Sequence, residues 1–355
     1  MCKMSSNDFK FDNSLLMVGQ FPPLVTGEAI CNKHVFDISI SCQKTIFMNT
    51  CIVQNAGDTG KLSLSKIFKS IYLWVRFIKL ISCCEKVYIT PGQTRFGLLR
   101  FIPFYLIASI FNKKVITHWH GYAILFLNNS VSNVCIRYIF KVSDVTILLT
   151  NDLLHKLKGL DIDISRCVVI HNFTNKLNSS SKNKFKIQAL FLSSLMPEKG
   201  IYEFLDCVKQ NPEINFVLCG KGSVDIENFI INTYGRLPNF NFKGVVSGDV
   251  KEKVFAETDV FILPTYYPTE GVPLALLEAM SAGCAVITTY HNGIPETLLD
   301  NGFYVAKKNS HEISHILSVL DENRVLLSEY QNKSAKRSLD FSYEKFKDQI
   351  ISVIK

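Results

Sequence analysis

Two carboxylates stand eight residues apart in the segment EGVPLALLE, which runs from Glu270 to Glu278. An apolar helix is predicted to begin near Pro273, because proline is favoured in the first turn of a helix. Unpaired N–H groups and the helix dipole make the start of a helix a binding place for anions and for sugar oxygens. Two acceptor carboxylates beside it suit a ligand that carries both phosphate and hydroxyl groups, as a nucleotide sugar does.

The neighbouring segments predict where this pair lies in a fold. Residues 259–264 (DVFILP) and 285–289 (AVITT) are typical of buried strands, and Gly283 is a helix stop between them. Ligands of open α/β sheets bind beyond the carboxyl ends of the strands. Two glutamates elsewhere are more simply a loop end and a solvated helix position, but these two follow a strand, which favours a binding site.

The run PTYYPTEGVPLALLEAMSAGCAVITT, residues 264–289, resembles the retaining glycosyltransferases of family 4, also called group 1. The E-x7-E signature of that family matches Glu270 and Glu278, and the resemblance is strong from Leu190 to Glu296. It implies the α/β fold named GT-B, in which two doubly wound Rossmann-like domains face a central cleft and a C-terminal helix crosses back to the first domain. It also implies retaining, metal-independent transfer, with no cofactor beyond the nucleoside-diphosphate-sugar co-substrate.

The resemblance implies roles for residues of the second half. Glu270 is expected to position the donor sugar, and Glu278 is expected to bind the ribose hydroxyls. Lys199 matches a family lysine that holds the donor diphosphate, where a cation neutralises the leaving group. Ser194 stands where the family usually has an arginine, which departs from the pattern for phosphate binding.

Two further loops of the second half follow predicted strands. Gly220 belongs to a Gly-Lys-Gly turn, where glycine permits close approach of the backbone to a ligand but also serves a simple tight turn. Val245 follows Lys243-Gly244, and its backbone is a candidate contact for the nucleotide base. Either Lys221 or Lys243 is the expected substitute for the missing arginine.

The motif HWHG, residues 118–121, ends a predicted strand of the first half. The resembled family keeps a His-Gly there beside the donor sugar, which His120 matches, whereas an isolated histidine on a strand is more often a satisfied core residue. His118 and His120 are conceivable as a zinc pair, but no third ligand comes with convincing spacing. The sequence Asp161-Ile162-Asp163 lacks a carboxylate cluster, so no metal site is predicted.

Two weaker candidates complete the site. Gly27 matches a glycine-containing family loop that approaches the donor diphosphate, although glycine and proline there also mark an ordinary turn. Arg95 follows the predicted strand at residues 87–90 and is either a partner for an acceptor phosphate or a residue of a surface loop. The predicted catalytic residues are therefore Glu270, Lys199 and His120, and the predicted substrate-binding residues are Gly27, Arg95, Gly220, Val245, Gly271, Val272, Pro273, Leu274 and Glu278.

Size and composition are those of a globular protein with two domains. The chain has 355 residues, of which 47% are hydrophobic and 20% charged. The eleven cysteines include no C-x-x-C pair, and the polar start of the chain lacks an apolar signal core, so a cytoplasmic protein with reduced thiols is expected. The predicted division is a first domain over residues 1–174, a linker over 175–186, a second domain over 187–340 and a crossover helix over 341–355.

Charge is distributed unevenly along the chain. Residues 1–173 carry 19 Lys and Arg against 10 Asp and Glu, whereas the remaining residues carry 20 against 21. A basic first half indicates an anionic partner, and a lipid-diphosphate acceptor or an anionic membrane surface fits better than nucleic acid. The predicted helix over residues 66–80 alternates basic and large apolar side chains, as both a lipid-bound helix and a core helix with a basic rim do.

The function predicted from these features is transfer of a sugar from a nucleoside-diphosphate-sugar to a hydroxyl of a lipid-linked glycan. The Lys- and Asn-rich composition suggests the assembly of a bacterial surface polysaccharide, such as lipopolysaccharide O-antigen or capsule, at the inner face of the membrane. Two alternatives remain, a nucleotide-sugar epimerase of similar shape and a non-catalytic nucleotide-sugar-binding protein. Release of nucleotide that depends on an acceptor distinguishes the transferase from both.

Overall fold

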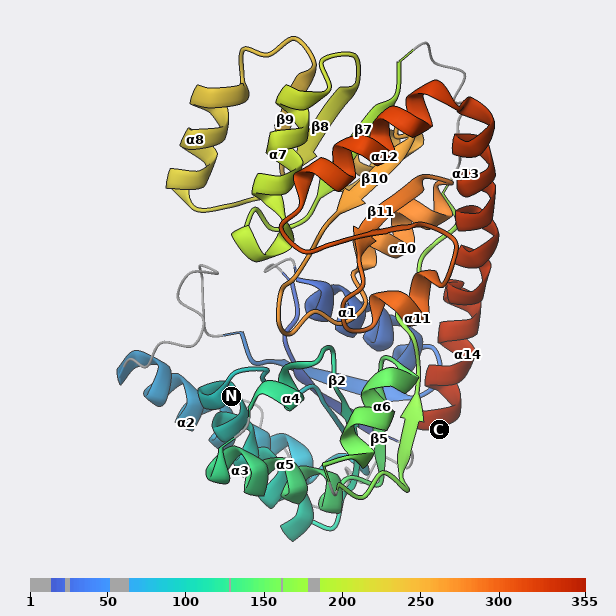
Figure 1. Ribbon diagram of the computed structural model, residues 1–355. Helices are drawn as coiled ribbons and strands as arrows, with labels where there is room; N and C mark the ends of the chain where they lie inside the picture. The colour runs from blue at the N-terminus through green and yellow to red at the C-terminus, as the bar shows by residue number, and fades with distance from the viewer. Residues whose placement is uncertain (1–13, 23–25, 52–63, 128, 161, 178–185) are drawn as a thin grey trace. The chain divides into compact units, whose positions relative to one another are not determined.

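The structure is a computed structural model that describes residues 14–22, 26–51, 64–127, 129–160, 162–177 and 186–355 (Figure 1). The chain forms two compact units. The first unit contains residues 1–171 and 346–355, and the second contains residues 172–345. Each unit is built around its own six-stranded sheet, so each has a hydrophobic core of its own.

The sheet of the first unit is parallel throughout, with the order β2-β1-β3-β4-β5-β6. Because β2 lies on one side of β1 and β3 on the other, the chain reverses direction across the sheet between β1 and β3. That reversal is the place where open α/β sheets bind ligands. The strands are β1 (Ser14–Gly19), β2 (Lys44–Asn49), β3 (Lys86–Ile89), β4 (Lys114–His118), β5 (Val145–Leu148) and β6 (Cys167–Val169).

Helices connect these strands and cover the sheet. Except for α1, their apolar faces pack with the buried residues of β1, β3 and β4 into one continuous core. Four of them have N-cap side chains that accept a hydrogen bond from the first turn: Thr26 in α1, Thr94 in α3, Asn129 in α5 and Thr150 in α6. The helices are α1 (Gly27–Ile40), α2 (Leu64–Ile81), α3 (Arg95–Ile110), α4 (Ala123–Phe126), α5 (Ser130–Val142) and α6 (Asn151–Lys158).

The second unit repeats this architecture with the order β12-β11-β10-β7-β8-β9, again all parallel. Its first strand, β7, lies at the centre beside β10, so the reversal of direction falls between β7 and β10. All four residues of β10 are buried, as a strand covered on both faces requires. The strands are β7 (Gln188–Leu192), β8 (Asn215–Cys219), β9 (Phe240–Gly244), β10 (Val260–Leu263), β11 (Ala285–Thr289) and β12 (Phe303–Val305).

The helical elements of the second unit range from a 3-residue 3₁₀ helix to a 15-residue α-helix. The longest, α13, packs beside α10 and β11, and the chain then turns into α14, whose residues from Phe346 onward belong to the first unit. The elements are η2 (Pro197–Lys199), α7 (Ile201–Gln210), α8 (Val224–Tyr234), α9 (Gly248–Ala256), α10 (Leu274–Ser281), α11 (Ile294–Leu298), α12 (Ser310–Glu322), α13 (Arg324–Ser338), η3 (Leu339–Phe341) and α14 (Tyr343–Ile354).

The predicted fold class, two doubly wound α/β domains with a returning C-terminal helix, is confirmed. The helix predicted to begin near Pro273 is α10, which begins at Leu274; Pro273 is its N-cap with ψ 124°, one position before the first helical residue. The fixed φ of proline suits both positions, so sequence alone does not separate them. No helix among the described residues is long and apolar enough to cross a membrane.

The two units divide between His171 and Asn172, three residues before the predicted boundary. The short segment after the division is bonded to the second unit, since Asn172 Nδ2 donates to the carbonyl of Val272 at 2.8 Å and the Thr174 N–H donates to Phe341 at 2.8 Å. Most of the predicted linker, residues 178–185, lies outside the described residues.

Candidate functional site

The centre of the candidate site is the reversal between β7 and β10 in the second unit. The loop after β7 forms the short helix η2 and carries Lys199 at its end, whereas the loop after β10 carries Glu270 and leads into α10. Because β7 and β10 are hydrogen-bonded neighbours, their loops leave the sheet side by side. The topology thus brings together two residues that are 71 positions apart in sequence.

Lys199 and Glu270 form an ion pair at this point. Lys199 Nζ donates to Glu270 Oε2 at 2.5 Å, and the two side chains are only 14% and 9% exposed. The Lys199 ammonium also lies 4.9 Å from the centre of the Tyr267 ring, a cation–π arrangement. Two of the three predicted catalytic residues are therefore in direct contact, and the lysine presents a cation held in one place.

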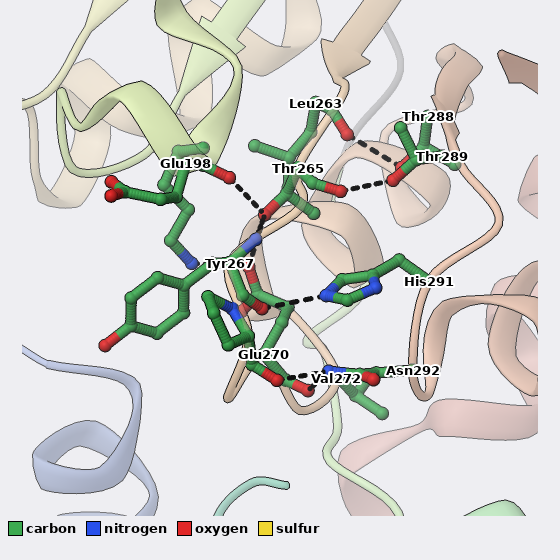
Figure 2. Close-up of polar contacts among 12 residues, drawn as sticks. Glu198, Leu263, Thr265, Tyr267, Glu270, Val272, Thr288, Thr289, His291 and Asn292 are labelled. Atoms are coloured by element: carbon green, nitrogen blue, oxygen red, sulfur yellow. Dashed lines mark hydrogen bonds and ion pairs between the residues drawn. The ribbon is translucent and has the colours of Figure 1, made fainter. Parts of the chain in front are cut away.

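The carboxylate of Glu270 is supported from its own loop (Figure 2). The Thr265 hydroxyl lies 3.1 Å from Glu270 Oε2 and accepts the N–H of Tyr267 at 3.2 Å. Asn292 Nδ2 donates to the carbonyl of Glu270 at 3.0 Å, and His291 Nε2 lies 2.8 Å from the carbonyl of Tyr267. The contacts of Asn292 and His291 come from the loop after β11. With Lys199 after β7, the loops after three neighbouring strands, β7, β10 and β11, therefore hold the position of Glu270.

A glycine permits the two central loops to approach one another. Gly200 has φ 84°, and a Cβ atom there would stand 2.5 Å from Pro264 Cγ and 2.7 Å from the Pro264 carbonyl oxygen. Just before it, the carbonyl of Glu198 accepts the Tyr266 N–H at 2.7 Å. The two residues therefore have different roles: Lys199 presents the cation, and Gly200 permits the close backbone contact that positions it.

The residues predicted to bind through their backbone form the entrance to α10. Gly271 and Val272 are buried, Pro273 and Leu274 are half-buried, and the Val272 carbonyl is occupied by Asn172. The second carboxylate of the motif, Glu278, lies within α10 and has a partner of its own. Glu278 Oε1 pairs with Lys251 Nζ of α9 at 2.6 Å, with side chains 22% and 26% exposed.

The loops after β8 and β9 show a structural reason for one predicted residue. Gly220 has φ 145°, and a Cβ atom there would stand 1.9 Å from the carbonyl oxygen of Ser193. Its N–H donates to the carbonyl of Gly244 at 2.8 Å. Backbone packing thus requires this glycine whether or not a ligand contacts it. Val245 and Ser194 are both exposed, so their side chains lie open to solvent.

Three predicted residues lie in the first unit and are described within it. Gly27 is the first residue of α1, Arg95 is the exposed first residue of α3, and His120 follows β4. Burial lowers the pKa of His120 to about 3 and holds the pKa of His118 well below its usual range, so both rings are neutral at physiological pH. Asp161, part of a sequence judged unsuited to metal, lies outside the described residues.

Sequence reasoning did not identify Glu28, the second residue of α1. Its Oε1 is buried and has no hydrogen-bond partner among the described residues, and burial raises the pKa of this carboxyl to about 7. Thr90 and Gln93, from the loop after β3, oppose that shift by hydrogen bonding. A carboxyl that titrates near neutrality at the reversal point of a sheet has the properties of a functional group. The only sequence signal was its place after the loop containing Gly27.

Comparison with known proteins finds a similarity to glycosyltransferases in the second unit. Residues 172–338 match the family described as glycosyl transferases group 1. The chain is 24% identical over 186 residues to the putative colanic acid biosynthesis glycosyltransferase WcaL of Salmonella typhimurium, an alignment that covers 47% of this chain and 45% of that protein. It is 26% identical over 172 residues to the N,N'-diacetylbacillosaminyl-diphospho-undecaprenol alpha-1,3-N-acetylgalactosaminyltransferase of Campylobacter jejuni, covering 46% and 44%. The chain thus spans less than half the length of these curated relatives.

A solved structure extends the likeness to nearly the whole chain. The crystal structure of Anabaena HepE in complex with UDP-glucose superposes with a TM-score of 0.75 and covers 96% of this chain and 99% of that one. The sequences are only 15% identical, so this likeness shows a shared fold. It confirms the GT-B architecture that the sequence resemblance implies.

The buried carboxyl of Glu28 predicts a pH-dependent stability. Its pKa is about 7 in the folded protein and 4.5 ordinarily, so its contribution is fully present below pH 4.5 and is lost as the pH rises through 7. Raising the pH from 5 to 7 should lower the free energy of unfolding of the wild type by about 2 kcal/mol more than that of Glu28→Gln. Urea denaturation at the two pH values measures this difference. The exposed Glu252→Gln is the control, and equal pH dependence in all three proteins would contradict the assignment.

Proposed function

Residues 172–338 match the glycosyl transferases group 1, and from that premise we propose that this protein is a retaining, metal-independent glycosyltransferase. It transfers a sugar from a nucleoside-diphosphate-sugar donor to a hydroxyl of a lipid-linked glycan acceptor during the synthesis of a bacterial surface polysaccharide. The observation that carries this proposal is the buried Lys199–Glu270 ion pair at the reversal point of the family-matched sheet. No cofactor beyond the donor itself is required.

The geometry suggests how the donor would be held. The Lys199 ammonium binds the donor diphosphate together with the free N–H groups at the start of α10, and Glu270 accepts hydrogen bonds from the donor sugar. Glu278 exchanges Lys251 for the ribose hydroxyls. In the reaction, the bond from the anomeric carbon to the phosphate oxygen breaks and the acceptor oxygen bonds to that carbon on the same face. The departing phosphate takes the proton of the acceptor hydroxyl. His120 of the first unit contacts the donor sugar.

The relatives support the classes of donor and acceptor. HepE is described in complex with UDP-glucose, which supports a nucleoside-diphosphate-sugar as donor. The Campylobacter relative is named for an undecaprenol-diphosphate-linked acceptor, and WcaL is named for the biosynthesis of colanic acid. The Campylobacter name supports a lipid-linked glycan as acceptor. Independently, the basic charge of the first half of the chain favours an acceptor that carries phosphate.

An exposed surface on α2, the helix that packs on α3, supports binding of the protein to an anionic membrane. Large apolar side chains of α2 are exposed to solvent, including Leu64 (75%), Phe68 (70%) and Tyr72 (64%). The opposite side of α2 packs on α3, since the Phe77 and Phe104 ring centres are 5.0 Å apart. Neither helix contains an acidic residue. An apolar and basic face without acids suits the interface of an anionic bilayer.

The activity should depend on both members of the central ion pair. Glu270→Gln and Lys199→Met are each expected to lower turnover by about 100-fold or more, because each removes a group that stabilises the departing diphosphate or the sugar. Each single change also leaves a buried charge unpaired, which costs about 3–5 kcal/mol of stability. The double variant leaves neither charge and should regain most of that stability while staying inactive.

Acceptor-dependent release of nucleotide in the presence of a chelator measures this activity, and thermal unfolding measures the stability. Near-native turnover in either single variant would refute the site. Isomerised donor without acceptor would indicate the epimerase, and binding without turnover would indicate the non-catalytic protein.

The two ends of the Glu278–Lys251 pair should differ in their effect on donor binding. Glu278→Ala should weaken the binding of the nucleotide diphosphate at least about tenfold, because it removes the partner of the ribose hydroxyls. Lys251→Ala should change the affinity by at most about fivefold, the cost of a solvent-accessible ion pair. Calorimetric titration with the nucleoside diphosphate of the active donor compares them. Equal losses in both variants would contradict the role given to Glu278.

Binding to vesicles should require the basic residues of α2. The triple change of Lys69, Arg76 and Lys79 to Gln is expected to weaken binding to vesicles of anionic lipid about 100-fold, at about 1 kcal/mol for each basic residue near the surface. Flotation with anionic and with neutral vesicles measures the binding. As a control, changing Lys307, Lys336 and Lys347 to Gln removes the same charge elsewhere and should have little effect. Equal flotation with neutral lipid would exclude this surface as an electrostatic membrane contact.

A further inference from the structure

The histidines of the HWHG motif have a third neighbour that the sequence does not reveal. Cys31 lies in α1, 87 positions before His118, and its side chain is completely buried as a free thiol. One ligand atom from each of Cys31, His118 and His120 lies within 4.8 Å of the other two. From this cluster we propose that the first unit contains a regulatory binding site for a thiophilic divalent cation of the Zn²⁺ type.

The topology explains how three distant positions meet. His118 is the last residue of β4, and His120 follows two residues later, so both rings leave the carboxyl end of that strand together. The ring centres are 4.0 Å apart and the planes are tilted by 38°. Cys31 enters from α1, which follows β1, and the single strand between β1 and β4 is β3. The three side chains therefore converge over the carboxyl edge of the sheet, where β3 contributes Tyr88.

The ring nitrogens are arranged as those of metal ligands are. The Tyr88 hydroxyl is hydrogen-bonded to His118 Nδ1, which fixes the ring and leaves Nε2 as the nitrogen able to bind a metal. His118 is completely buried, and its Nε2 has no hydrogen-bond partner among the described residues. The same holds for Nε2 of His120, which is buried although the residue as a whole is partly exposed. Buried nitrogens without a partner are rare unless a ligand or water satisfies them.

The donor set selects the class of ion. Two imidazole nitrogens and one sulfur suit Zn²⁺ and similar cations, whereas Mg²⁺ and Ca²⁺ require oxygen ligands. As the metal–sulfur bond forms, the Cys31 thiol releases its proton to the buffer, and both histidines bind as neutral rings. Three protein ligands leave a fourth position for water. Metal–ligand bonds of about 2.0–2.3 Å place the ligands of a tetrahedral site less than 4.8 Å apart, so the cluster contracts when the ion binds.

A consequence for the reaction follows, and it rests on the proposed function. A cation bound to His120 occupies its ring nitrogen, so this side chain can no longer contact the donor sugar. The ion therefore inhibits a transferase that needs no metal for its chemistry. Cys31 is required for this inhibition, yet it is not part of the machinery that binds donor or acceptor, so its removal separates the two properties.

The binding experiment uses Co²⁺ as an optical substitute and Zn²⁺ as competitor, with the full chain and no substrate. The wild type should bind one Co²⁺ with the near-ultraviolet absorption of a cobalt–thiolate bond, which Zn²⁺ abolishes. Cys31→Ser should lose that absorption and at least about 100-fold in affinity, the upper end of the cost of perturbing a metal site from its second shell. Cys84→Ser, another buried cysteine of the first unit, is the matched control and should bind as the wild type does.

A second variant keeps the test decisive if Cys31→Ser fails to fold. His118→Gln should lose affinity as strongly, and Tyr88→Phe should lose about tenfold, because it removes only the hydrogen bond that orients His118. Co²⁺ bound equally by the wild type and the folded variants, or bound without thiolate absorption, would overturn the site.

The activity arm tests the regulatory consequence by itself. Zn²⁺ should inhibit acceptor-dependent nucleotide release by the wild type and by Cys84→Ser, and it should inhibit the otherwise active Cys31→Ser at least tenfold less. Equal inhibition of all three proteins would overturn the regulatory role. If no protein releases nucleotide but Co²⁺ binds through Cys31, the proposed function fails and the metal site stands.

Discussion

A lysine and a glutamate kept out of water at a break in a parallel sheet are costly to maintain unless each is paired. In this protein Lys199 and Glu270 satisfy one another, with Thr265 and the Tyr267 ring as further partners. The surrounding loops have the features needed to hold that pair: a left-handed glycine against Pro264, and side chains from the loop after β11 bonded to the backbone beside Glu270. A pair held this firmly provides a fixed cation beside a fixed carboxylate, which suits the sugar diphosphate proposed as the donor.

The order of the strands determines why the pair lies where it does. In the second unit the central neighbours β7 and β10 send their chains in opposite directions across the sheet, which opens a space above their carboxyl ends. The first unit repeats the arrangement with β1 and β3, and there the space is lined by a different chemistry. Glu28 lies near the loop after β3, and the Cys31, His118 and His120 cluster lies on the adjoining edge. One architecture thus presents the loop proposed to bind phosphate and sugar in one unit and a buried polar cluster in the other.

The sequence predicted the parts of this account that depend on local pattern. Short runs such as VFIL and AVITT correctly predicted strands, and they placed Glu270 and Glu278 after the carboxyl end of one of them, because that end is recognisable from its neighbours. What it could not predict depends on contacts between distant segments. Lys251 meets Glu278 only because α9 and α10 are adjacent, and Cys31 meets His118 only through the order of β1, β3 and β4. The helix over residues 66–80 illustrates the same limit, since only the folded unit shows that Phe68 and Tyr72 are exposed while Phe77 is buried.

The central claim is that the second unit grips an activated sugar through Lys199 and Glu270. Calorimetric titration of the wild-type chain with a panel of uridine, guanosine, cytidine and thymidine diphosphate sugars tests it most directly. The account predicts that at least one of them binds with a dissociation constant between about 1 μM and 1 mM, the usual range of substrate constants, and that Lys199→Met abolishes this heat. Folded wild-type protein that binds no sugar nucleotide of the panel would contradict the account.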